Sequence, residues 1–115
     1  MIISNALVLL VALLHVWFMI LEMYFWTRPL GRKAFGLTKE SAEATKVMAQ
    51  NQGIYNGFLA AGLIWGVISH LHDVKVFFLA CVIVAGIVGA FTANKKILYI
   101  QAFPALAALM AVVCL

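Results

Sequence analysis

The sequence predicts an all-α membrane protein, an antiparallel bundle of four transmembrane helices. Of its 115 residues, 66% are hydrophobic and 10% are charged, whereas a soluble domain has about 45–50% apolar and about 25% charged residues. A soluble domain of this size leaves too much surface exposed to hide so much apolar area from water. The apolar residues also fall into four stretches separated by polar segments, and a lipid bilayer is the solvent that suits such stretches.

A spanning helix needs roughly 20 mostly apolar residues. We therefore expect a single membrane domain over residues 1–115, with spans at about 2–26, 47–69, 74–93 and 97–115. The first stretch lacks the basic start and the cleavage site of a signal peptide, so we expect it to remain as a span.

Residues 27–52 are predicted to form a basic loop followed by a helical extension of the second span. The loop begins before Pro29, because proline disfavours helix in the residue that precedes it. Thr38 is a good N-cap, and Glu40 suits the positive end of the helix dipole. We expect one helix from Lys39 to Ser69, of which the first part projects from the membrane.

Short turns and small residues predict which helices are neighbours. The turns at 70–73 and 94–96 are short enough to require antiparallel neighbours. Small residues spaced four apart let helices approach closely in lipid, and they favour packing of the second helix against the third. The pairs are Gly53 and Gly57, Gly62 and Gly66, Ala85 and Gly89, and Gly86 and Ala90. Pro104 lies inside the last helix and predicts a kink there.

The placement of charge predicts the orientation. Seven of the eight basic residues lie in 27–52 or 94–96, and the eighth is Lys75. By the positive-inside rule those two segments are cytoplasmic, so both termini of this multi-pass cell-membrane protein face outward. The net charge of +4 is thereby accounted for by basic residues on the cytoplasmic side of the membrane, and we expect no nucleic-acid partner.

Polar side chains from several helices are predicted at one depth, in the cytoplasmic half of the bilayer. Glu22 lies about one turn inside that face, and Gln101 enters from the fourth helix. His15 lies on nearly the same face as Glu22, about 10 Å nearer the membrane centre. Three more polar residues share one face of the second helix by their spacing. The candidate ligand-binding residues are Glu22, Gln52, Tyr55, Asn56, Gln101 and His15.

Glu22 is the best candidate for a catalytic residue. An ionisable group inside a membrane is costly and therefore indicates a function, and Glu22 is the only acid or base at this depth. Two alternatives stay open: Glu22 reaches the headgroups, or it pairs with a basic residue such as Arg32. His15 is either a neutral side chain bonded to a neighbouring helix or a proton site.

No motif specifies a metal or a cofactor. The run from His70 to Asp73 is one short polar turn, and closed metal sites require three or four ligands in defined geometry. Cys81 and Cys114 lie in apolar spans and are read as small packing residues.

Several segments resemble a widespread family of small bacterial membrane proteins of unknown function. The resemblance covers nearly the whole chain and rests on residues 22–26 (EMYFW), 31–35 (GRKAF) and 51–58 (NQGIYNGF). It implies the four-span fold and no activity.

A weaker resemblance is to the membrane-associated proteins in eicosanoid and glutathione metabolism, which have four spans and a second helix that extends into the cytosol. Here Ala49, Gln52, Tyr55 and Asn56 match their second-helix motif, although Tyr55 replaces an acid. Only Lys46 stands for the arginines before the Ala. The resemblance implies a trimer with a site at its subunit interfaces, and glutathione as a cofactor.

The residues together predict a protein that binds a small amphipathic or lipidic molecule at the inner leaflet, with conversion of that molecule left open. We expect a homo-oligomer, with a trimer as its first candidate form. One alternative is a proton-coupled exporter, since small multidrug transporters are similar in length, span count and a membrane Glu in helix one. Their site lies nearer the membrane middle than Glu22. The other alternative is a non-catalytic structural or regulatory subunit.

Overall fold

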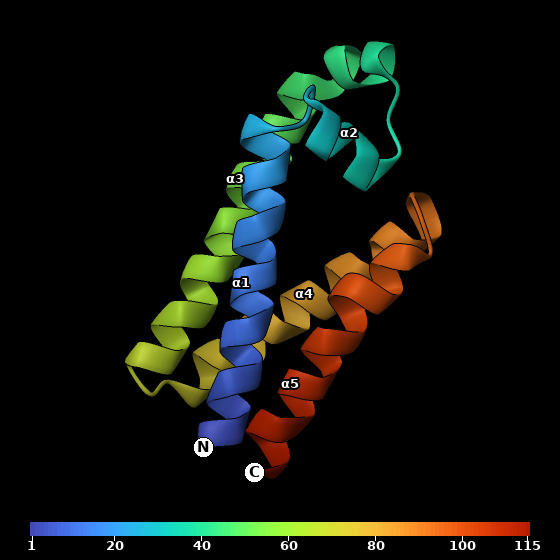
Figure 1. The fold of residues 1–115 in the computed structure, drawn as a ribbon. Coiled ribbons are helices and arrows are strands. Elements are labelled where there is room, and N and C mark those ends of the chain that lie inside the picture. Colours follow the sequence, from blue (N-terminus) through green and yellow to red (C-terminus); the bar gives the residue numbers. More distant parts are fainter. The chain divides into compact units, whose positions relative to one another are not determined.

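The structure, a computed structural model that describes residues 1–115, contains helices and no strands, which confirms the predicted all-α class. In chain order its elements are α1 (Ile2–Tyr24), α2 (Pro29–Phe35), α3 (Lys39–Ile68), α4 (His72–Thr92), the π-helical segment η1 (Leu98–Ala102) and α5 (Phe103–Cys114) (Figure 1). By length and composition, α1 and α4 are apolar enough to cross a membrane. Residues Leu98–Cys114 form a shorter apolar helix, and α3 is longer but more polar.

The predicted long helix after the basic segment is confirmed, since α3 runs unbroken from Lys39 to Ile68. Its start is capped as the sequence suggests. The Ser41 backbone nitrogen donates to Thr38 Oγ1 over 3.0 Å, and the Thr38 nitrogen donates to Ser41 Oγ over 3.1 Å. These reciprocal bonds satisfy donors that a helix start leaves unpaired.

The basic loop prediction is corrected, because residues Pro29–Phe35 form the short helix α2. Proline is favoured at the first helical position, where it has no bond to lose. Gly36 ends the helix with φ of 66°, a left-handed conformation that glycine adopts without strain. Gly31 holds α2 against the preceding turn: a Cβ at this position would overlap the carbonyl oxygen of Phe25.

The predicted kink at Pro104 corresponds to η1, a wider turn directly before the proline. The Phe103 nitrogen donates to the carbonyl of Leu98, five residues back. Proline has no N–H, and its ring clashes with the carbonyl four residues earlier in a regular α-helix. A π-helical turn moves that carbonyl aside, and such turns are a recognised cause of helix irregularity.

The chain divides into two compact units, which we call the terminal unit (residues 1–13 and 59–115) and the 14–58 unit. Since α1 and α3 each contribute residues to both units, a single membrane domain stays a prediction.

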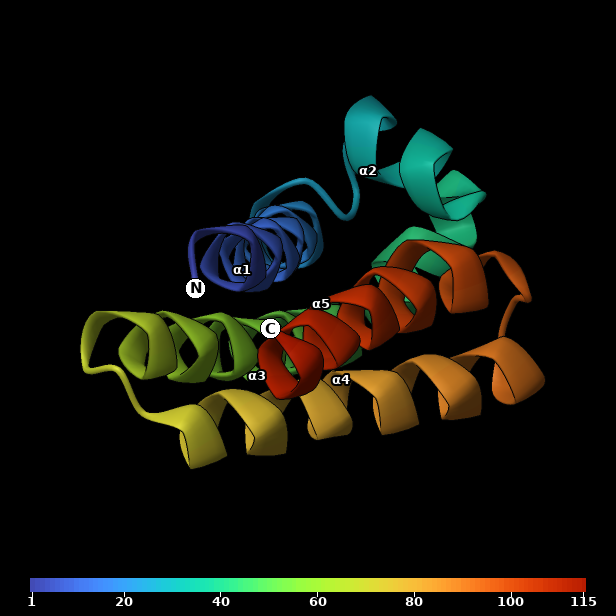
Figure 2. The same ribbon diagram turned by 90° about the horizontal axis from the view of Figure 1, so that it is seen from below.

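In the terminal unit, α3 lies antiparallel to α4, and α4 lies antiparallel to η1 and α5. Gly62 faces Phe78, whereas Gly86, later in α4, faces Ala102, and a Cβ at Gly86 would lie 2.8 Å from the Ala102 Cβ. Figure 2 shows α4 and α5 side by side. Both chain ends and the α3–α4 turn lie at one end of this unit, and the turn after α4 lies at the other (Figure 1).

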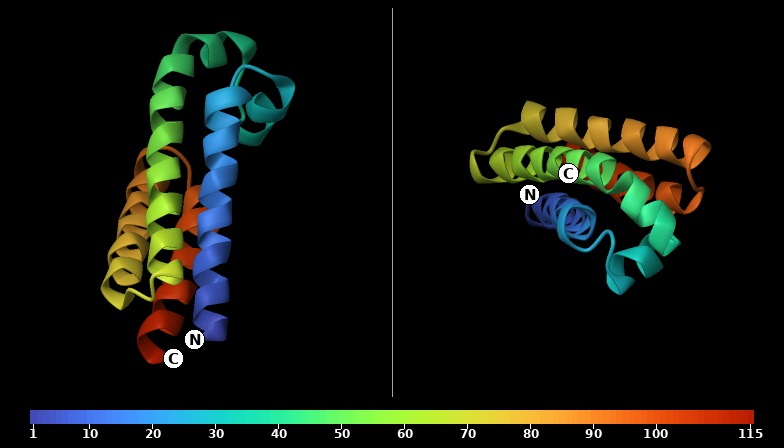
Figure 3. Two further views of the ribbon diagram at one scale, coloured as in Figure 1. Left: turned by 90° about the vertical axis from the view of Figure 1, so that its left-hand side faces the viewer. Right: turned by 90° about the horizontal axis from the view of Figure 1, so that it is seen from above.

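In the 14–58 unit, the end of α1 lies antiparallel to the first two-thirds of α3 (Figure 3). A Cβ at Gly57 would lie 2.8 Å from the Met19 sulfur, and one at Gly53 would overlap Met23. The predicted contact of the second helix with the third therefore holds for Gly62 and Gly66 only. The other glycine pair faces α1, because helix rotation along α3 turns successive small faces toward different neighbours.

Candidate functional site

A half-buried polar pair joins α1 and α3 within the 14–58 unit. Asn56 Nδ2 on α3 donates a hydrogen bond to Glu22 Oε1 on α1, and both side chains are half-buried. Gly53 and Gly57 flank Asn56 along α3 and allow α1 to approach closely enough for the bond. A hydrogen bond to a carboxylate is roughly twice as strong as one between neutral groups. Two of the predicted site residues are therefore brought together.

Beside this pair is a small cavity of about 60 Å³, the polar notch. It has room for only a few atoms, and it offers a carboxylate, an ammonium, an amide and hydroxyl groups. The residues that line it are Glu22, Met23, Tyr24, Trp26, Thr27, Lys46 and Gln50. This mixture of donors and acceptors can bind a polar head group through several hydrogen bonds at once.

An open depression of about 520 Å³, the apolar groove, continues from the notch along α3. Its walls are mostly apolar, and the side chains of Val47 and Met48 are 71% and 69% exposed. It is lined by Met23, Val47, Met48, Gln50, Asn51 and Ile54. Met23 and Gln50 belong to both depressions, so the polar notch and the apolar groove share a wall.

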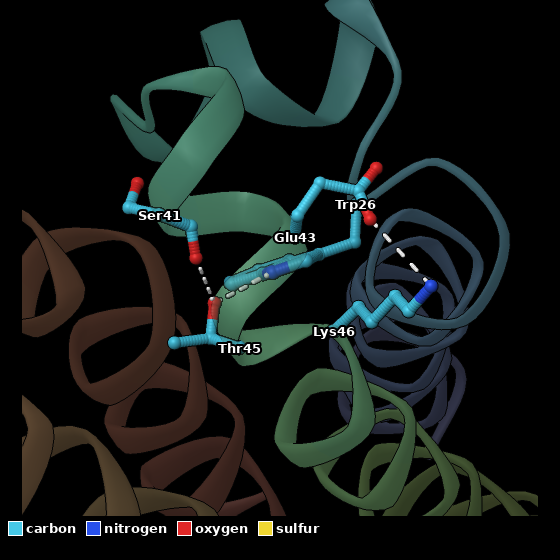
Figure 4. Close-up of polar contacts among 5 residues, drawn as sticks. All are labelled: Trp26, Ser41, Glu43, Thr45 and Lys46. Atoms are coloured by element: carbon cyan, nitrogen blue, oxygen red, sulfur yellow. Dashed lines mark hydrogen bonds and ion pairs between the residues drawn. The ribbon is translucent and has the colours of Figure 1, made fainter.

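Hydrogen bonds hold one wall of the notch in place (Figure 4). Trp26 Nε1 donates to Thr45 Oγ1 over 3.0 Å, and Thr45 Oγ1 in turn donates to the Ser41 carbonyl over 2.7 Å. The Trp26 ring also packs on Phe35, with 4.9 Å between ring centroids. The indole ring is therefore fixed on both sides before any molecule binds, which lowers the entropy lost on binding.

Neither Lys46 nor Arg32 forms an ion pair with Glu22, so the predicted pairing with a basic residue such as Arg32 is not found. Lys46 Nζ lies 3.5 Å from Glu43 Oε2, one turn earlier on α3. Arg32 makes no ion pair with Glu22, whose hydrogen-bond partner is Asn56. Lys46 still lines the notch, so the ammonium is available to a bound molecule at the cost of a weak exposed ion pair.

The remaining candidates of the second helix lie on the surface. Gln52 is exposed, and Gln50 lines both depressions. Tyr55 is 50% exposed, and its hydroxyl accepts a bond from Asn51 Nδ2 over 3.4 Å. Gln50 follows Lys46 by one helical turn, and this spacing is a sequence signal that could have identified it.

His15 and Gln101 are not among the residues that line the notch. The His15 side chain is fully buried in α1, and its ring meets Phe18 edge to face with 5.4 Å between centroids. Gln101 is half-buried on η1, in the terminal unit. A single volume in the cytoplasmic half shared by Glu22, Gln52, Asn56 and Gln101 stays a prediction.

One buried charged residue of the terminal unit was not anticipated. Lys75 on α4 is 6% exposed, and its Nζ donates to Asn5 Oδ1 over 3.1 Å. Gly66 makes room for it, since a Cβ there would lie 2.7 Å from Lys75 Cγ. The signal was a lysine at the start of a predicted span, with a glycine near the end of the preceding span.

Fold and site together define a small all-α protein with two helices apolar enough to cross a membrane and a polar notch beside an apolar groove. Residues 9–113 match the family described as "Protein of unknown function (DUF1304)", and the chain belongs to this family. It is similar to the "Uncharacterized protein YpaA" of Lactococcus lactis subsp. lactis (strain IL1403), with 35% identity over 107 residues that cover 89% of each chain. No solved structure matches.

These matches confirm the resemblance to a small family of unknown function. They do not support the resemblance to proteins of eicosanoid and glutathione metabolism. Glutathione binding therefore has only the second-helix residues in its favour, and among these Tyr55 replaces the acid.

Proposed function

We propose that this protein is a four-span membrane protein that binds a small amphipathic or lipidic molecule in the 14–58 unit. The polar head would occupy the polar notch and the apolar tail would lie along the apolar groove. The observation that carries this proposal is the shared wall: Met23 and Gln50 line both depressions. A molecule with one polar and one apolar end matches two adjoining surfaces of those two kinds.

The head has several partners of different chemistry. Glu22, already bonded through one oxygen to Asn56, lines the notch, and so do Gln50 and Lys46. Glu22 can accept from an amine or hydroxyl, Lys46 can donate to a phosphate or carboxylate, and the Gln50 amide can do both. A head group that carries both donors and acceptors fits this set best.

The tail would contact apolar side chains that lie along α3. Met23 and Met48 are flexible and polarisable, so they adapt to chains of different shape. An open groove suits a molecule that enters sideways from the bilayer. If the bound molecule is also converted, Glu22 is the acid or base that touches it.

The proposed topology has the termini outside and residues 27–52 and 94–96 in the cytoplasm. The placement of basic residues supports it. The terminal unit is consistent with it, because both chain ends lie at one end and the turn with Lys95 and Lys96 at the other (Figure 1). We also propose a homo-oligomer, with a trimer as the first form to be sought by native mass spectrometry.

Cysteine labelling tests the topology. In a background of Cys81→Ala and Cys114→Ala, an impermeant thiol reagent applied to intact cells should leave Lys33→Cys unlabelled. The same reagent should label it after the cells are opened. Labelling of Lys33→Cys in intact cells would refute the orientation.

Glu22→Gln tests the site. The amide keeps the shape and can still accept from Asn56, so thermal stability in detergent should change little. Amphipathic molecules that co-purify with the wild type, detected by native mass spectrometry, should be lost or strongly reduced, because a charge-assisted bond is replaced by a neutral one. Glu40→Gln is the matched control, since Glu40 is exposed in the first turn of α3, does not line the notch and is not the ion-pair partner of Lys46.

Two outcomes would favour the alternatives. Equal retention of co-purified molecules by wild type and Glu22→Gln would favour a structural or regulatory subunit. Proton-driven efflux of a dye from reconstituted vesicles, abolished by Glu22→Gln, would favour an exporter.

A further inference from the structure

Arg32, on the short helix α2, carries a buried donor with no partner. Its Nε is inaccessible to solvent and makes no hydrogen bond within the protein. The structure also gives this guanidinium no ion pair, although the side chain as a whole is only partly buried. Buried polar atoms without partners are rare in folded proteins, and a ligand or a water is one explanation for such an atom.

The segment around Arg32 is strongly basic. No acidic residue occurs from Met23 to Thr38, an interval that contains Arg28, Arg32 and Lys33. Arg28 and Lys33 are exposed. The uncompensated charge and the unpaired Nε together favour an anionic ligand.

Apolar side chains surround the same segment. Leu30 and Phe35 on α2 are 49% and 40% exposed, and Tyr24 at the end of α1 is 65% exposed. The helix itself is held firmly, because Gly31 lies against the Phe25 carbonyl and Phe35 packs on the Trp26 ring. A soluble anion would leave these apolar groups in water, whereas a lipid headgroup brings an apolar layer with it.

We infer that α2 and its flanking residues bind the phosphate of an anionic phospholipid headgroup, with Arg32 as the central contact. The planar guanidinium can donate to phosphate through two parallel bonds, one of them from Nε. Arg28 and Lys33 add charge attraction, as juxtamembrane basic clusters do at the cytoplasmic leaflet. Leu30 and Phe35 then contact the acyl boundary.

The charged contacts of this site differ from those of the site proposed above, although Tyr24 borders both. None of Arg28, Arg32 and Lys33 lines the polar notch or the apolar groove. Arg32 variants should therefore lose lipid selectivity and still retain the molecule bound in the notch. Glu22→Gln should lose that molecule and keep the lipid selectivity. The two proposals can fail independently.

The test is lipid retention by the full chain. The protein is reconstituted into nanodiscs of phosphatidylcholine with phosphatidylglycerol, released, and examined by native mass spectrometry for bound phosphatidylglycerol. The wild type should retain phosphatidylglycerol over phosphatidylcholine. Arg32→Gln should weaken that retention roughly tenfold, the equivalent of one lost hydrogen bond to a charged group. Retention of phosphatidylglycerol by Arg32→Lys should lie between that of the wild type and that of Arg32→Gln. Lysine keeps the positive charge but cannot donate the two parallel hydrogen bonds of a guanidinium.

Lys39→Gln is the matched control, since it removes the same charge from an exposed position at the start of α3. Three results would overturn the inference: no preference for phosphatidylglycerol in the wild type, an equal loss in Lys39→Gln and Arg32→Gln, or full displacement of the lipid by inorganic phosphate. If Arg32→Gln does not fold, the double variant Arg28→Gln with Lys33→Gln replaces it. That variant should then lose the preference, and its retention of the preference would refute the site.

Discussion

Different contacts hold the two units together. The terminal unit contains twelve of the fifteen buried apolar side chains, and its helices meet through glycine and alanine. The 14–58 unit has three buried apolar side chains, Leu21, Ala42 and Ala49. Its long-range bonds are polar: Glu22 with Asn56, and Trp26 with Thr45.

The difference in contacts bears on the two depressions, both of which are lined by residues of the 14–58 unit. Helices in lipid gain little from apolar burial and associate through close packing and hydrogen bonds. Close packing, as between Gly86 and Ala102, leaves no room for a ligand. The polar bonds of the 14–58 unit hold α1 and α3 together at a few points, and both depressions lie between and beside those points.

The largest difference between the units is expected when one methyl group is added to a glycine in each of them. At Gly86 the new Cβ would lie 2.9 Å from the Ala102 backbone nitrogen, which cannot move without its helix. Gly86→Ala should lower the free energy of unfolding in detergent by about 1–3 kcal/mol, the usual cost of overpacking. At Gly57 the neighbour is the flexible end of Met19, so Gly57→Ala should be neutral or, through helix propensity, slightly stabilising. Equal losses would mean that both units are equally rigid.

Next in size is the Glu22–Asn56 pair. Asn56→Leu removes the donor and leaves a half-buried carboxylate without its partner, so the free energy of unfolding should fall by about 1–3 kcal/mol. A double-mutant cycle with Glu22→Leu should give a coupling energy of at least about 0.5 kcal/mol. Additive losses would show that the pair does not stabilise the 14–58 unit.

A smaller effect should follow from Trp26→Phe, which keeps an aromatic ring and removes the bond to Thr45. The expected loss is about 0.5–1.5 kcal/mol. Trp65→Phe, at a position 53% exposed in the terminal unit, is the control and should change stability by no more than about 0.5 kcal/mol. Intrinsic fluorescence and thermal unfolding measure both variants, and a cost in Trp65→Phe as large as in Trp26→Phe would contradict the assignment.

The smallest effect concerns the one buried cation of the terminal unit. Lys75→Met keeps the stem beside Gly66 and removes the bond to Asn5. Since hydrogen bonds between membrane helices average about 0.6 kcal/mol, the free energy of unfolding should fall by about that amount. A loss of several kcal/mol, measured by denaturation in detergent, would show that Lys75 is as important to the terminal unit as close packing.

Local signals in the sequence were sufficient for much of the fold. Thr38 and the absence of glycine and proline from Lys39 to Gln52 predicted the long helix α3, which the structure confirms. The short helix α2 was missed, because seven residues give too short a pattern and its stability depends on contacts of Gly31 and Phe35 with the preceding turn.

The sequence by itself determined the all-α class and the apolar helices α1 and α4, since composition and helical spacing are local properties. Only the tertiary structure decided that Asn56 bonds Glu22 and that Gln50 lines the notch while Gln52 is exposed. Which side of a helix meets its neighbour depends on its rotation, and that rotation is set by contacts between residues far apart in the chain, such as Gly53 with Met23. The unpaired Nε of Arg32 was decided in the same way, because burial of a single atom depends on everything packed around it.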